Sequence, residues 1–165
     1  MPHLIDGNNL MHALAGIGVG ADRRELVELL EVLAAGGQRV CVVFDGPAPE
    51  GRLAEPIEAA NVEVVFSGHG PADEIINRRI AENTAPRRLT VVSTDREIRA
   101  AARRRRCTAV RSEDFAPRLM RAFREAARPP APPDEPPEKR RGLTPEQTAE
   151  WMRRFGYHPK RRKKP

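Results

Sequence analysis

Five short runs of apolar, mostly β-branched residues recur along the chain, and segments with helical periodicity follow most of them. The runs occupy residues 3–5, 39–44, 62–66, 89–93 and 108–111. The second run, RVCVVF, is too uniformly apolar for a one-sided sheet and is typical of a central parallel strand. Parallel strands need helices on both faces of their sheet. The alternation therefore predicts an α/β sandwich with a mostly parallel five-stranded sheet.

Helical periodicity fills most of the intervals between these runs. Leucines at positions 26, 29, 30 and 33 form an apolar stripe, and Asp22 with Glu25 resembles a capping box. Further helices are expected at residues 72–83, 96–106 and 112–128. Residues 54–60 are compatible with a short helix in the connection between the second and third strands.

The composition changes abruptly after Arg128, so we assign residues 1–128 to the folded domain. Residues 129–142 hold six prolines and predict a stiff, extended linker. Residues 143–156 predict a short helix with Thr144 as its N-cap and Pro145 in its first turn. Its apolar face, with Trp151 and Phe155, either docks on the domain or binds a partner. Residues 157–165 form a basic tail.

Most of the net positive charge lies in this C-terminal part. The formal net charge is +6, and residues 129–165 contribute ten lysines and arginines against five acids. Such a basic segment usually meets a polyanion, most commonly nucleic acid. No apolar run approaches the ~20 residues that span a bilayer, and the N-terminus lacks the apolar stretch of a signal peptide. With two isolated cysteines, the chain is expected to be a soluble cytoplasmic protein that makes no membrane contact.

Acidic residues follow four successive strands. Asp6 and Asp95 come directly after the first and fourth strands, Asp45 follows the second, and Asp73 with Glu74 opens the helix after the third. The carboxyl ends of parallel strands form the ligand crevice of an open α/β sheet. In the strand order 3-2-1-4-5, the first and fourth strands are neighbours. Asp6 and Asp95 are then expected side by side, with the other acids flanking them.

Several carboxylates in one crevice repel each other at neutral pH, and a bound divalent cation is the usual reason to retain them. Oxygen ligands without a histidine or cysteine cluster favour Mg²⁺ or Mn²⁺. Such ions activate water and stabilise the leaving oxygen of a phosphodiester. Taken singly, Asp45 before Gly46 also fits a turn, and Asp73 also fits a helix N-cap. Four acids at four successive strand ends favour a metal site.

Two further groups are candidates for binding substrate. Ser93 and Thr94 precede Asp95, where their hydroxyls can bond a phosphate, bond the carboxylate or cap the next helix. An arginine run ends the fourth expected helix, where positive charge suits the helix dipole and can also contact an RNA backbone. The run comprises Arg103, Arg104, Arg105 and Arg106.

The segments IDGNN, VVFDG, VEVVFSG…ADEII and VVSTDREI resemble the signature blocks of the NYN branch of PIN-like nucleases, and within it the YacP-like proteins. The resemblance covers roughly residues 3–125 and implies a three-layer PIN-like sandwich. The family's DG-x-N pattern maps onto Asp6, Gly7 and Asn9, and its other acids map onto positions 45, 73 and 95. Two departures, Gly70-Pro71 before the third block and Glu97 as the nearest acid after the fourth, make the acid set leaner.

The resemblance implies a metal-dependent endoribonuclease. Asp6 and Asp95 are expected to hold the principal Mg²⁺ or Mn²⁺, Asp73 to complete the catalytic set, and Asp45 to serve as a ligand or an outer support. Asn9 is expected to fix Asp6 or a phosphate. Some YacP-like members act on ribosomes, which extends the expected partners to ribosome-associated mRNA. A non-catalytic RNA-binding module and a metal-dependent phosphatase remain alternatives, and the oligomeric state stays open.

Overall fold

The computed structural model describes residues 2–48, 62–128 and 144–155. The chain divides into two units, residues 1–128 and 129–165, and each is described by itself. The expected linker at 129–142, the basic tail at 157–165 and the short helix considered at 54–60 lie outside the described residues. So do the side chains of Trp151 and Phe155.

The sheet has five strands in the order β3-β2-β1-β4-β5, and every neighbouring pair is parallel. This confirms the predicted strand order. The connections place β1 at the centre, between β2 and β4. The strands are β1 (His3–Asp6), β2 (Val40–Phe44), β3 (Val62–Phe66), β4 (Thr90–Val92) and β5 (Thr108–Val110).

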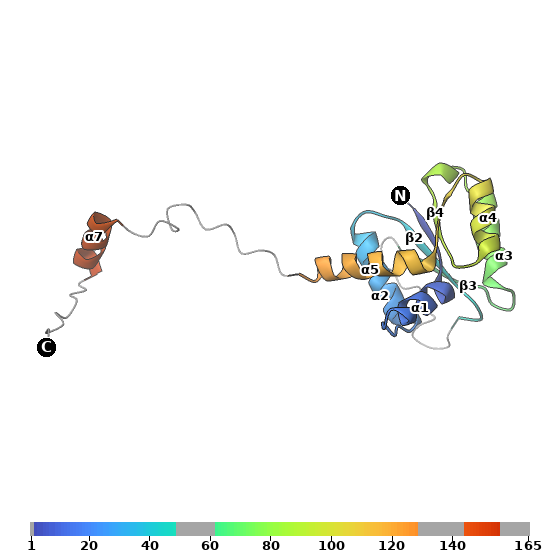
Figure 1. The fold of residues 1–165 in the computed structure, drawn as a ribbon, viewed down its shortest axis with the longest axis horizontal. Coiled ribbons are helices and arrows are strands. Elements are labelled where there is room, and N and C mark those ends of the chain that lie inside the picture. Colours follow the sequence, from blue (N-terminus) through green and yellow to red (C-terminus); the bar gives the residue numbers. More distant parts are fainter. Residues whose placement is uncertain (1, 49–61, 129–143, 156–165) are drawn as a thin grey trace. The chain divides into compact units, whose positions relative to one another are not determined.

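Helices cover both faces of this sheet, which confirms the predicted three-layer sandwich. Helices α1, α2 and α5 pack on one face, and α3 and α4 pack on the other (Figure 1). The helices are α1 (Gly7–Gly16), α2 (Arg23–Ala35), α3 (Ala72–Glu82), α4 (Arg96–Arg104) and α5 (Ser112–Ala126), with a short 3₁₀ turn η2 (Pro86–Arg88) before β4.

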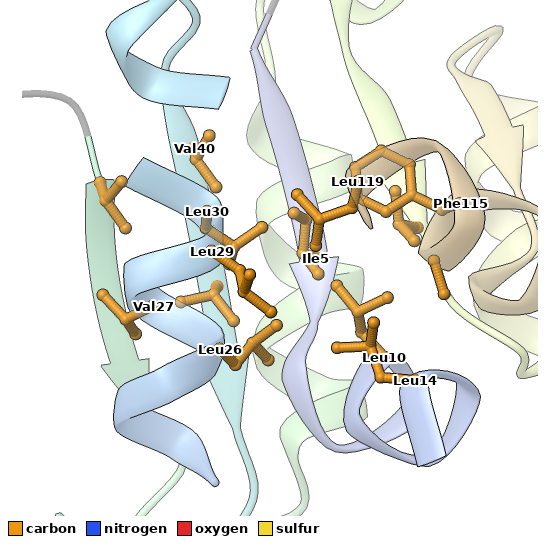
Figure 2. Close-up of a cluster of buried hydrophobic side chains, with 14 of the residues drawn as sticks. Ile5, Leu10, Leu14, Leu26, Val27, Leu29, Leu30, Val40, Phe115 and Leu119 are labelled. Atoms are coloured by element: carbon orange, nitrogen blue, oxygen red, sulfur yellow. The ribbon is translucent and has the colours of Figure 1, made fainter. Parts of the chain in front are cut away.

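Successive side chains of β1 pack against opposite layers of helices. Ile5 of β1 joins the cluster formed with α1, α2 and α5, whereas its neighbour Leu4 joins the cluster under α3 and α4. Figure 2 shows Ile5 among leucines of α1 and α2 and beside Phe115 and Leu119 of α5. Because both faces are covered, Leu4 and Ile5 of the central strand both meet apolar neighbours, which explains the uniformly apolar runs in the sequence.

The 3₁₀ turn η2 is absent from the sequence-based prediction, and so is helix α1. Its first residues, Gly7, Asn8 and Asn9, are poor helix formers and read as a turn. The helix forms because the Asp6 side chain accepts a hydrogen bond from the Asn9 backbone N–H at 3.0 Å, and because Leu10 and Leu14 are fully buried. The start of α1 is thereby fixed at the carboxyl end of β1.

The second unit contains one described helix, α7 (Pro145–Phe155). The Gln147 N–H donates to Thr144 Oγ1 at 3.3 Å, and the Thr144 N–H donates to Gln147 Oε1 at 3.0 Å. This reciprocal cap confirms Thr144 as the N-cap. Across the part of the chain that the structure describes, no helix is both long and apolar enough to cross a membrane.

Candidate active site

Asp6, the last residue of β1, is the most buried acid at the carboxyl edge of the sheet. Its side chain is 4% exposed. Oδ1 accepts the Asn9 backbone N–H, and Oδ2 accepts hydrogen bonds from Asn9 Nδ2 and, at 3.1 Å, from Ser93 Oγ. Burial raises the pKa of Asp6, the bonds from Asn9 and Ser93 oppose this, and the charge of Asp95 adds to the rise.

Ser93 joins the two central strand ends. Its fully buried hydroxyl donates to Asp6 and accepts hydrogen bonds from Asn9 Nδ2 at 3.1 Å and from the Asp95 backbone N–H at 3.0 Å. One donor and two acceptor positions are the full capacity of a hydroxyl. Ser93 therefore sets the position of Asp6 relative to the turn that carries Asp95.

Asp95 is the N-cap of α4. Its Oδ1 accepts the backbone N–H groups of Glu97 at 2.6 Å and Ile98 at 3.0 Å, whereas Oδ2 accepts no hydrogen bond from any described residue. The Arg99 guanidinium donates to the backbone carbonyls of Asp95 and Thr94 at 3.2 and 3.3 Å. One oxygen thus holds the helix, and the other is available for a ligand.

Asp45 ties the end of β2 to the start of α3. Its Oδ1 accepts the Ser67 hydroxyl at 3.2 Å and the Ala72 backbone N–H at 3.1 Å. Arg23 lies beside it: Nη2 donates to the Asp45 carbonyl at 2.6 Å, and the guanidinium lies 5.5 Å from the ring centroid of Phe44. No local signal reveals Arg23 in the sequence, because its contact to Asp45 depends on how α2 packs.

Asp73 is the acid whose pKa the charges of the other acids raise. It lies exposed in the first turn of α3, and the N-cap of that helix is Pro71, so Asp73 is not a cap. Its carboxylate accepts no hydrogen bond from the described residues. Partial burial is the largest cause that raises its pKa. The charges of four further acids raise the pKa further, with effects that decrease in the order Asp6, Asp95, Asp45 and Glu97.

Glu97 is therefore a site residue that the sequence reasoning noted but did not assign. It lies in the first turn of α4, two residues after Asp95. Its signal is this position, because the first turn of a helix that starts at a strand's carboxyl end faces the crevice. Four acids from β1, the β2 end and the start of α4 thus raise the pKa of a fifth, Asp73.

The donor chemistry fits a hydrated hard cation. Among the described residues, no group of three or more histidines, cysteines or acids lies close enough to enclose a metal ion. Mg²⁺ seldom uses an all-protein cage; it keeps several waters and binds through one or two carboxylates. Asp73 and the Oδ2 atom of Asp95 offer carboxylate oxygens without protein partners, and these fit such binding.

The remaining predicted residues lie at varied distances from this acidic site. Glu74 is exposed beside Asp73 on α3, and Thr94 is half-buried between Ser93 and Asp95. The arginine run from 103 to 106 is not brought to the acids. Helix α4 runs about 12 Å from Arg96 to Arg104, so the run lies at the amino-terminal edge of the sheet, beside the start of β5.

This fold, with its acids gathered at the carboxyl edge of the sheet, defines a PIN-like ribonuclease domain. The chain belongs to the YacP-like NYN domain family, which it matches over residues 3–154. The match reaches beyond the region recognised in the sequence, residues 3–125, and includes all but the last residue of α7.

Two crystal structures of Rae1 (YacP) from Bacillus subtilis share the fold. One is 20% identical with a TM-score of 0.58, and the alignment covers 94% of this chain and 88% of that one. The other, a tryptophan-to-leucine mutant, is 22% identical with a TM-score of 0.57, over 76% of this chain and 79% of that one. No curated protein matches the sequence.

Proposed function

We propose that this protein is a metal-dependent endoribonuclease whose active site is the acidic site at the carboxyl edge of the sheet. The observation that carries the proposal is the placement of Asp6, Asp45, Asp73 and Asp95 at one edge of the sheet, at the ends of β1 and β2 and the starts of α3 and α4. Asp73 and Asp95 would offer their unpartnered oxygens to a hydrated Mg²⁺ or Mn²⁺, and the hydrogen-bonded carboxylates of Asp6 and Asp45 would serve as further ligands or supports. The ion would supply activation of water and stabilisation of the leaving oxygen.

The chain's own residues divide the remaining work. Asn9 and Ser93 hold the buried Asp6 carboxylate in one orientation. Asp95 keeps its position because its Oδ1 atom caps α4, and its Oδ2 atom remains free to bind a ligand. Asp73 is exposed and accepts no hydrogen bond from the described residues, so its oxygens are free to bind the ion or the water that attacks the phosphodiester.

Family membership supports RNA as the substrate class. Our finer proposal is RNA on the ribosome, in the cytoplasm. The ten lysines and arginines among residues 129–165 suit a large polyanionic particle, because each phosphate contact adds affinity that falls with salt. A binding module without activity is disfavoured because such a module has no need for a carboxylate, Asp73, that lies among four other acids.

A circular single-stranded RNA tests the reaction type, because only an endonuclease can open a molecule without ends. We expect linear products in Mn²⁺ or Mg²⁺ and none with a chelator. Binding without opening would support the RNA-binding module instead. Release of phosphate from a nucleotide monophosphate, with the circle intact, would support the phosphatase.

A further inference from the structure

A second charged feature lies at the opposite edge of the sheet from the acids. A hollow of about 520 Å³ is lined by the turn at residues 84–86 and by five arginines. Among the residues that the structure describes, no acidic side chain lines it. We call it the arginine pocket, and its arginines are Arg87, Arg88, Arg104, Arg105 and Arg106.

Two segments distant in sequence build the arginine pocket. Arg87 and Arg88 belong to η2, which precedes β4. Arg104 ends α4, and Arg105 and Arg106 directly follow that helix, before β5. Arg106 adopts a left-handed backbone with φ of 64°, and this turn lets the Cys107 N–H donate to the Ala102 carbonyl at 2.9 Å. Since β4 and β5 are paired and parallel, their starting ends bring the two segments together.

Arg105 has a structural role in the arginine pocket. Its guanidinium donates to the carbonyls of Ile80 at 3.4 Å, Ala81 at 2.9 Å and Asn83 at 3.0 Å. These carbonyls belong to the last turn of α3 and its end, where no intrahelical N–H is available. Arg105 thus ties α3 to α4 and forms a fixed wall of the pocket.

The other four arginines of the pocket are exposed, and their guanidinium groups form no hydrogen bond or ion pair with any described residue. Elsewhere Arg24, Arg79, Arg111 and Arg121 pair with glutamates. The dipole of α4 favours positive charge at its own end but does not bring η2 arginines to the same hollow. Four unpaired guanidinium groups around one hollow repel one another, so an anion there relieves the repulsion.

We propose that the arginine pocket binds the sugar–phosphate backbone of RNA, at a site separate from the acidic site. The guanidinium fork matches phosphate oxygens in a two-point contact. Arginines from two segments can hold successive phosphates, which a single small anion would not need. No aromatic residue in the described part of the chain lines the pocket, so the proposed contact is to the backbone and not to stacked bases.

A groove links this pocket to the acids. A second hollow, of about 370 Å³, lies between α3 and α4 and shares Arg104 and Arg105 with the arginine pocket. Its lining includes Glu97, one of the acids that raise the pKa of Asp73. RNA held in the pocket therefore continues along the α3–α4 groove toward the acids. The cutting of that RNA rests on the proposed function; its binding in the pocket does not.

Salt-dependent binding of a fluorescent single-stranded RNA tests the pocket, measured by anisotropy on the full chain with a chelator present. The variant Arg87→Gln/Arg104→Gln removes one unpaired arginine from each segment. The control Arg118→Gln/Arg124→Gln removes two exposed, unpaired arginines from α5, on the other face. We expect the pocket variant to bind roughly tenfold more weakly and its log–log salt slope to shrink by about 1.4, or ~0.7 per lost phosphate contact.

The control is expected to bind within about twofold of the unmodified chain, because its arginines serve no phosphate. Equal losses in both variants, or no loss in either, would overturn the proposal, as would displacement of RNA by polyglutamate at equal charge. Arg88→Gln/Arg104→Gln repeats the test if the first variant melts early. Pocket-dependent binding without cleavage in Mg²⁺ refutes only the proposed function, whereas cleavage with pocket-independent binding refutes only the pocket.

Discussion

Gly7 is the residue at which the smallest substitution tests how β1, α1 and β2 pack. A Cβ atom there would lie 2.5 Å from Phe44 Cδ1, closer still to Phe44 Cε1, and 3.0 Å from Val42 Cγ2. Carbon atoms in contact stand about 3.5–4.0 Å apart. Phe44 is fully buried and stacks on Phe66 with ring centroids 5.7 Å apart, so the ring has little room to move.

We expect Gly7→Ala to destabilise the domain. Overpacking a core costs about 1–3 kcal/mol, and the better helix propensity of alanine returns up to about 1 kcal/mol. The net loss is about 1–2 kcal/mol, or roughly 4–8 °C in melting temperature for a domain of this size. Because Gly7 directly follows Asp6, we also expect RNA cleavage to fall.

Gly16, the last residue of α1, is the matched control. A Cβ atom there meets no atom of the described residues within 4 Å, so Gly16→Ala should stabilise the domain by about 0.4–1 kcal/mol. Urea unfolding of both variants measures the difference. In a Phe44→Leu background, the penalty of Gly7→Ala should shrink, since a smaller side chain faces the new methyl group. Equal effects at both glycines, or an unchanged penalty with leucine, would refute the packing argument.

Further predictions concern the acids and their supports. In metal-free buffer at pH 7, Asp73→Asn should melt at a higher temperature than Glu74→Gln. Burial and four nearby acids raise the pKa of Asp73, so its charge destabilises the folded domain. Glu74→Gln is the control because it removes the same charge from the same helical turn. A carboxyl with a raised folded-state pKa lowers the stability as the pH rises from the ordinary pKa of 3.8 through the raised one. The stability gained by Asp73→Asn should therefore vanish in urea unfolding at pH 3. A gain that persists at pH 3 would contradict the repulsion argument. Ser93→Ala should cost about 1–3 kcal/mol in chemical unfolding, because the Asp6 carboxylate and the Asp95 N–H lose their partner. Ser112→Ala should cost little, since that equally buried hydroxyl has no partner among the described residues, and equal losses would count against Ser93 as the link.

The sequence predicts the sheet because apolar runs are local signals, and rules of connection then limit the strand order. It predicts the acids for the same reason, since each directly follows a strand or starts the next helix. Helix α1 escapes because its stability comes from the Asp6 cap and the burial of Leu10 and Leu14. The role of Arg105 escapes too, because it depends on carbonyls 22 to 25 residues earlier in the chain.

Cleavage rate against Mn²⁺ concentration, for Asp95→Asn beside Asp22→Asn, tests the central claim most directly. Asp95 is the N-cap of α4, and Asp22 is the N-cap of α2. Asparagine caps a helix as well as aspartate does, so both variants should fold. We predict a saturating Mn²⁺ dependence, a loss of about 100-fold or more for Asp95→Asn, and a rate within about twofold for Asp22→Asn. Undiminished cleavage by Asp95→Asn, or by the unmodified chain in a chelator, would contradict the proposed active site.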